Sequence, residues 1–226
     1  VLIAIPAQDG TASRSPQKET RYAPRVRSLL CPVRIRLWGS GTGITVRNCT
    51  FEHVNKAVQM KAPENDDAID VVRIVDNRVS HTDHGAFVLL DGGAWGRSDT
   101  VTGRLYDVQI LRNNIDTIGL RPTRYGHGHA IEVECAETLE VAGNILHRCY
   151  GAGLFVWGAK RSGLAADRPL ARLLVHHNKV TDPLLNSNDW GGIETWQFVG
   201  PFLRDFTGAA PTGAGRDAGA LEMKER

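Results

Sequence analysis

The sequence of 226 residues has few cysteines, no long apolar run and little net charge, and each shortage narrows the classes of protein that fit. Its four cysteines contain no CxxC pair and no metal-binding spacing, so we expect buried free thiols, with a Cys135–Cys149 disulfide left open. No apolar stretch reaches about 20 residues, so no membrane span is expected. The first six residues are too short for a signal peptide and lack its basic start.

Charge also argues against one class of partner. The formal net charge is only +2, and no dense run of Lys and Arg with interleaved aromatics occurs. Nucleic acid is therefore not an expected partner. Dense clusters of Asp are absent as well, which weakens the case for a calcium site.

What the sequence does contain is an apolar frame that occurs five times around an asparagine-like position. Apolar residues stand five and three positions before each centre, and two positions after it. The centres, spaced by 28, 36, 31 and 34 residues, are Cys49, Asn77, Asn113, Asn144 and Asn178. A period of this length predicts a solenoid, in which stacked units bury one continuous core.

Each unit is expected to hold two short strands. The apolar alternation before the centre is rich in Val and Ile, which predicts a strand with one buried face. About ten residues after the centre comes a second alternating run, led by small residues. Its inward positions are expected to be Val58, Phe87, Ile131, Leu154 and Ile193, followed by Met60, Leu89, Val133, Val156 and Thr195. The asparagines themselves are expected to stack into a hydrogen-bonded ladder, with Cys49 as a small buried substitute at one end.

Segments 46–51, 110–115 and 141–146 carry this frame most clearly, and over about residues 40–200 the chain resembles the right-handed parallel β-helix proteins of the pectate-lyase-like type. The resemblance implies an all-β coil of about five turns and an extracellular or periplasmic location. It implies no single reaction, because this fold hosts lyases, hydrolases, epimerases and non-catalytic surface proteins. The fixed short leucine spacing of a leucine-rich repeat is absent.

The frame also predicts the domain organisation. Residues 1–40 are expected to form a loose arm or partial cap, residues 41–200 the repeat domain, and residues 201–226 an irregular tail. A solenoid needs both ends covered, and neither terminal segment has the pattern of a cap. We therefore expect a truncated or rearranged member of this fold.

Stacking turns sequence positions into surface columns, which predicts where chemistry is concentrated. The outward residues of the second strand form one column of Gln59, Val88, Glu132, Phe155 and Glu194 and another of Lys61, Leu90, Glu134, Trp157 and Trp196. The turn before this strand contributes Val54, Asp83, His127, Tyr150 and Asp189. Carboxylates, histidines and tryptophans are thus expected on one face.

Glu132 and Glu194 are expected two rungs apart, with their backbones about 9.6 Å from each other. Inverting glycosidases hold their two carboxyl groups about 6.5–9.5 Å apart, so the pair fits a general acid and a general base. Asp189 is the third carboxylate candidate. Exposed Trp157, Trp190 and Trp196 suit the apolar faces of sugar rings. We therefore expect a glycoside hydrolase that acts on a polysaccharide and needs no cofactor.

Two alternatives stay open at this point. A polysaccharide lyase would use the loop that contains Arg124, Tyr125, His127 and His129 to remove a proton beside a uronate carboxylate. Calcium could assist it, with oxygen ligands from Asp83, Glu132 or Asp189. His127 and His129 also permit a transition metal, with Asp83 or His84 as a third ligand, although no metal site is expected. The other alternative is a non-catalytic surface or adhesion protein, and the oligomeric state is not predicted.

Overall fold

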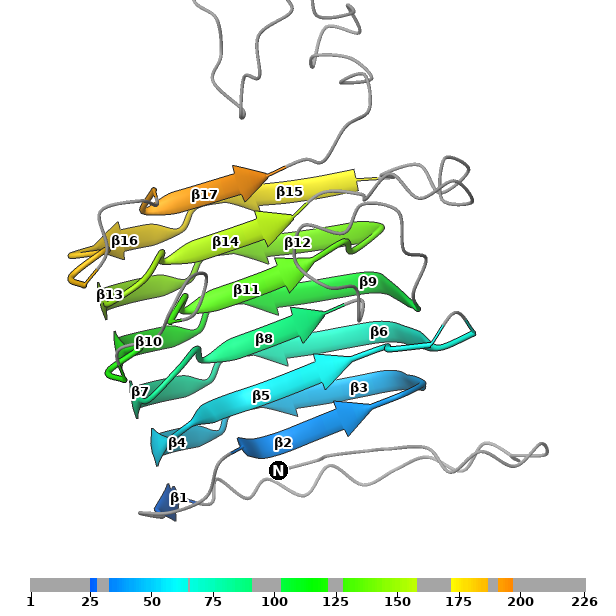
Figure 1. The fold of residues 1–226 in the computed structure, drawn as a ribbon, viewed down its shortest axis with the longest axis horizontal. Coiled ribbons are helices and arrows are strands. Elements are labelled where there is room, and N and C mark those ends of the chain that lie inside the picture. The colour runs from blue at the N-terminus through cyan, green and yellow to red at the C-terminus, as the bar shows by residue number, and fades with distance from the viewer. Residues whose placement is uncertain are drawn as a thin grey trace, which may run out of the picture.

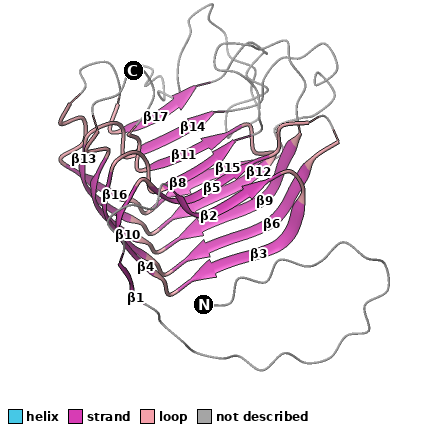
Figure 2. Cartoon of the chain, turned by 60° about the horizontal axis from the view of Figure 1, so that its bottom comes forward, coloured by secondary structure: helices cyan, strands magenta, loops and turns pink. Residues whose placement is uncertain are grey.

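The computed structural model describes residues 25–27, 33–64, 66–90, 103–121, 128–157, 172–186 and 191–196. The regular secondary structure in these ranges consists of β-strands alone, and the strands form three parallel sheets (Figure 1). The chain is a right-handed parallel β-helix, which confirms the expected fold and agrees with the handedness of parallel crossovers. Figure 2 shows the sheets as three walls around a common interior.

The sheets are named here by their place in each coil. Sheet A contains β1 (Arg25–Arg27), β4 (Thr50–Val54), β7 (Arg78–Thr82), β10 (Asn114–Ile118), β13 (Ile145–Cys149) and β16 (Lys179–Thr181). Sheet B contains β2 (Val33–Trp38), β5 (Lys56–Lys61), β8 (Phe87–Leu90), β11 (Ile131–Glu134), β14 (Leu154–Trp157) and β17 (Ile193–Trp196). Sheet C contains β3 (Gly41–Arg47), β6 (Ala68–Val75), β9 (Arg104–Leu111), β12 (Thr138–Ala142) and β15 (Arg172–His176).

Each coil therefore has three strands, and the expectation of two was wrong. The strand that the sequence did not predict is the one in sheet A, directly after the asparagine. Ile115 and Ile118 of β10 are both fully buried although they are three residues apart, because Thr117 between them has a left-handed φ of 58°. One left-handed residue shifts the alternation by a position, so a period of two no longer marks the strand.

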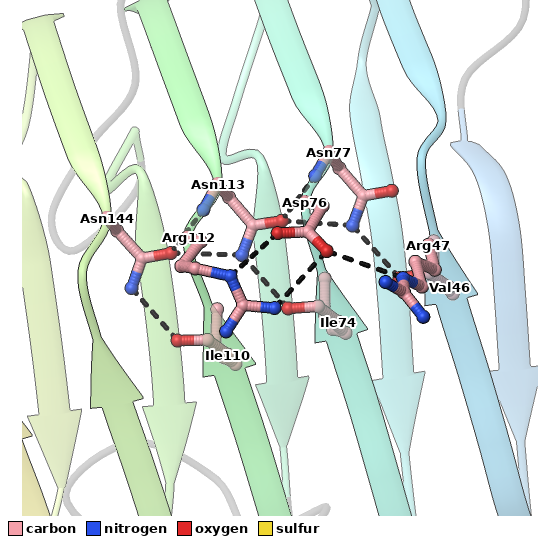
Figure 3. Close-up of polar contacts among 9 residues, drawn as sticks. All are labelled: Val46, Arg47, Ile74, Asp76, Asn77, Ile110, Arg112, Asn113 and Asn144. Carbon is pink, nitrogen blue, oxygen red and sulfur yellow. Dashed lines mark hydrogen bonds and ion pairs between the residues drawn. The ribbon is translucent and has the colours of Figure 1, made fainter.

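The predicted asparagine ladder is confirmed and lies at the corner between sheets C and A (Figure 3). The backbone N–H and the side-chain amide of Asn113 both donate to Oδ1 of Asn144 at 2.9 Å, and the same amide donates to the carbonyl of Ile74 at 2.9 Å. Asn77 makes the equivalent bonds to Asn113, and the backbone N–H of Cys49 donates to Oδ1 of Asn77 at 3.0 Å.

The left-handed residue at this corner stands one position before the asparagine and not at it. Asn48, Asp76, Arg112 and His177 have φ values of 54°, 57°, 53° and 54°, and Gly143 has 66°. This geometry directs their side chains away from the core, where Asp76 pairs with Arg112 at 2.8 Å and with Arg47 at 3.3 Å (Figure 3). The Arg112 guanidinium is the main reason that the pKa of Asp76 lies below its usual value.

The predicted inward positions fill the interior, except in the last strand. Residues such as Met60, Phe87 and Ile131 are fully buried, whereas Ile193 in β17, the terminal strand of sheet B among the described residues, is 49% exposed. Cys49, Cys135 and Cys149 are free thiols, so the Cys135–Cys149 disulfide does not form. Within the predicted arm, β1 pairs with β4 and β2 pairs with β5. No helix of the described segments is suited to crossing a membrane.

Candidate functional site

The outer face of sheet B has the register that the sequence predicts. One column runs across the strands through Arg36, Gln59, Val88, Glu132, Phe155 and Glu194. Beside it, Trp38, Lys61 and Leu90 pair in turn, as do Glu134, Trp157 and Trp196. Glu132 and Glu194 therefore lie two strands apart on one column, as expected, and each is half-buried.

Glu132 on β11 sits in an environment that favours its protonated form. Burial is the main cause that raises its pKa to about 8, and the negative charge of Glu134 adds to the effect. Lys56 on β5 opposes it. Burial also lowers the pKa of Lys56, and the nearby Arg36 acts in the same direction. A glutamic acid with such a pKa carries a proton at neutral pH, which is what a general acid requires.

Glu194 on β17 is held in a different way. The backbone N–H of Gly191 donates to its Oε2 at 2.6 Å. A Cβ on residue 191 would lie 2.8 Å from the same oxygen, so the Glu194 side chain would have to shift to accommodate it. A hydrogen bond of this kind fixes the orientation of the carboxyl group.

Two apolar side chains of this column are shielded from solvent. Phe155, between Glu132 and Glu194, is 1% exposed, and Val88, on the other side of Glu132, is 3% exposed, although both lie outside the interior core of the coil. The His129 ring stacks on Phe155 with a centroid distance of 4.5 Å and an interplanar angle of 9°. The Nδ1 atom of His129 accepts a hydrogen bond from the Ala152 N–H at 3.0 Å, which places the ring proton of a neutral imidazole on Nε2. His129, which the sequence predicts as a base in a loop, is fully buried and packs against this face.

The turn that contains Asp83 and His84 lies beside His129. A Cβ on Gly85 would meet the His129 carbonyl oxygen at 2.7 Å, so the two turns are in close backbone contact. Asp83 is 44% exposed at its side chain and forms an ion pair with Arg121 at 2.8 Å. His84 is half-buried, and its carbonyl accepts a hydrogen bond from Thr82 at 2.7 Å. The structure thus brings these predicted residues next to the buried histidine.

Other predicted site residues cannot be located in the same way. His127, Asp189, Trp190, Arg124 and Tyr125 lie outside the described residues. The strand positions of two further tryptophans are established, since Trp157 pairs with Trp196 between β14 and β17. In sequence these two stand two positions beyond Phe155 and Glu194.

Sequence reasoning missed the basic part of this face. Arg36 and Trp38 lie on β2, which precedes the first apolar frame, and Lys56 begins β5 ahead of the column that was considered. The alternation of Val33, Ile35 and Leu37 was the available signal. Because β2 pairs with β5, it adds these side chains to the outer face of sheet B.

A groove of about 430 Å³ lies elsewhere, on the outer face of sheet A. Its lining includes Glu52 and Asp116, but Asp116 forms an ion pair with Arg148 and lies 3.1 Å from Nδ1 of His147. Across the described ranges, no three His, Cys, Asp or Glu side chains form a group that could hold a metal ion.

Comparison with known proteins adds no relationship to this geometry. The sequence matches no protein-family model and no curated protein, and no solved structure matches the chain.

Proposed function

We propose that the chain is a carbohydrate-active protein, a glycoside hydrolase that cleaves a polysaccharide on the outer face of sheet B. The observation that supports this most strongly is the pair of carboxylates on one column in unlike environments. Glu132 and Glu194 are separated by the single strand β14, and their surroundings differ: burial raises the pKa of Glu132, whereas Glu194 accepts a hydrogen bond from the Gly191 N–H. Two carboxyl groups with opposed environments are the usual arrangement of a general acid and a general base.

The spacing suits the inverting reaction. Two strand intervals put the two backbones about 9.6 Å apart, and tilted side chains bring the carboxyl groups into the range of about 6.5–9.5 Å that leaves room for a water molecule. In this mechanism Glu132, with its raised pKa, donates its proton to the glycosidic oxygen. Glu194, oriented by the Gly191 N–H, removes a proton from the attacking water.

The polymer is proposed to run across the strands, parallel to the axis of the coil. The rigid sheet holds successive outward side chains about 4.8 Å apart, which forms an extended row of contacts. Trp157 and Trp196 are proposed to contact sugar rings from the neighbouring column, and Asp189 and Trp190 to contribute at the end near Glu194. An extracellular or periplasmic location suits such a substrate and is part of the proposal.

Release of reducing ends from polysaccharides tests the proposal. Glu132→Gln and Glu194→Gln should each reduce turnover about 10²-fold or more, because each removes one proton-transfer group. Glu140→Gln is the matched control, since Glu140 lies on sheet C and bonds to Gln109 and His176. Full turnover in both variants would refute the carboxylate pair.

The same assay separates the alternative functions. A product with a carbon–carbon double bond, detected by ultraviolet absorbance, would indicate a lyase that acts on uronates and would direct attention to Arg124, Tyr125, His127 and calcium. Glycan binding with no cleavage of any polysaccharide would indicate an adhesion protein.

A further inference from the structure

Strands β2 and β5, at one end of sheet B, present cations without any acidic side chain. The outward and strand-end positions of β2 and β5 carry Arg34, Arg36, Lys56 and Lys61, and neither strand contains Asp or Glu. Arg34 has two guanidinium nitrogens, Nε and Nη2, that are shielded from solvent and have no hydrogen-bond partner among the described residues. Clustered cations without matching carboxylates create a local positive potential in a chain whose net charge is only +2.

Two of these cations are pre-organised around an exposed aromatic ring. Trp38 is 51% exposed, and the guanidinium carbon of Arg36 and the Nζ of Lys61 lie 4.7 Å and 5.1 Å from its ring centroid. Cation–π contacts of this kind hold the charged groups beside the ring and reduce the rotamer entropy that binding would cost. The exposed part of the ring remains able to contact the C–H surface of a sugar.

This basic platform, defined as Arg36, Lys56, Lys61 and Trp38, is continuous with the carboxylate column. Arg36 pairs through Gln59 and Val88 to Glu132, so the two residues lie three strands apart, about 14 Å between backbones. Lys56 is close enough to both Arg36 and Glu132 to interact with each charge. A polymer that crosses the strands at Glu132 would therefore reach the platform a few sugar units away.

We propose that the basic platform binds the anionic groups, carboxylate or sulfate, of an acidic polysaccharide whose chain continues to Glu132. This inference rests on the proposed function for the position of the cleavage site, but the binding itself does not require hydrolysis. Guanidinium and ammonium groups recognise both anions by charge-assisted hydrogen bonds, and the ring of Trp38 supports the sugar that carries them. The substrate class is thus an acidic glycan and not a neutral one.

Binding to the full chain carrying Glu132→Gln tests the proposal with no turnover in the readout. The probes are polygalacturonate, dextran sulfate and neutral dextran, measured by isothermal titration calorimetry. At least one of the two anionic polymers should bind tenfold or more tightly than dextran, and the tighter one identifies the anionic group. Equal binding of dextran, or binding of neither anion, would overturn the proposal.

Variants then locate the binding to the platform. Arg36→Gln combined with Lys61→Gln should lower the affinity for the anionic polymer about tenfold, as expected for the loss of two partly exposed charge contacts. Arg36→Lys with Lys61→Arg should retain the affinity. The control pair Arg78→Gln and Lys179→Gln removes two cations from sheet A, and an equal loss there would show a net-charge effect and contradict the platform. If the chain hydrolyses a polysaccharide but shows no preference for anionic polymers, this inference alone is refuted. If it binds anionic polymers through the platform but hydrolyses none, the proposed function alone is refuted.

Discussion

Replacing Asn113 by alanine tests the physical basis of the ladder. Asn113 is 1% exposed, and its Oδ1 accepts both the backbone N–H and the side-chain amide of Asn77 at 2.9 Å. Its own amide donates to the Ile74 carbonyl. The substitution leaves the Asn77 N–H and the Ile74 carbonyl buried without these partners. At about 1–3 kcal/mol for each of these two groups, the free energy of unfolding should fall by about 2–6 kcal/mol.

Equilibrium unfolding in urea, followed by circular dichroism, measures this loss. Asn178→Ala is the matched control, because Asn178 makes the same bonds to Asn144 and Val141 but is only half-buried in the last rung. Water can reach the groups exposed by that substitution, so its cost should be less than half as large. A loss below about 1 kcal/mol for Asn113→Ala, or an equal loss for both variants, would show that the ladder does not stabilise the coil as argued.

Two further predictions concern backbone strain and charge burial. Val71→Gly should raise the free energy of unfolding by about 1 kcal/mol, because a β-branched residue is strained at a φ of 55°. The equivalent position of the neighbouring strand β3, Gly43, is already glycine. A decrease in the urea midpoint of the variant would contradict this prediction. The raised pKa of Glu132 means that the folded state holds its proton more tightly than the unfolded state, so this group lowers stability progressively as pH rises from 4.5 to about 8. Glu132→Gln should therefore gain at least about 1 kcal/mol relative to the parent between pH 5 and pH 8, and an unchanged difference across this window would show that Glu132 is not buried as an acid.

The parts of the fold that could be predicted are those that repeat in register. The centres, asparagine in four coils and Cys49 in another, recur with their apolar neighbours, and stacking aligned Glu132 with Glu194 as the spacing required. The strand after each asparagine escaped prediction because a left-handed residue such as Thr117 interrupts its alternation. That conformation depends on the corner of the coil and has no fixed residue type: His53, His81, Thr117, Arg148 and Asp182 share it in sheet A or directly after it.

The site was predictable in position more than in environment. Outward register indicates which residues share a column, but the burial of Phe155 comes from His129, a residue in a turn that lies across the outer face. The raised pKa of Glu132 comes from burial and from the charge of Glu134 on the same strand, with Lys56 of another strand opposing it. Contacts between separate turns and strands determine these properties, and the sequence pattern of one strand does not contain them. The basic platform was missed because β2 precedes the first repeat.

The configuration of the first sugar released is the most direct test of the proposed carboxylate pair. ¹H NMR during the first minutes of a digestion distinguishes the two anomers before they interconvert. Glu132 and Glu194 lie two strands apart, a spacing that suits an inverting enzyme, and therefore predict a product of inverted anomeric configuration. A product with retained configuration, or one with an unsaturated ring, would contradict the account.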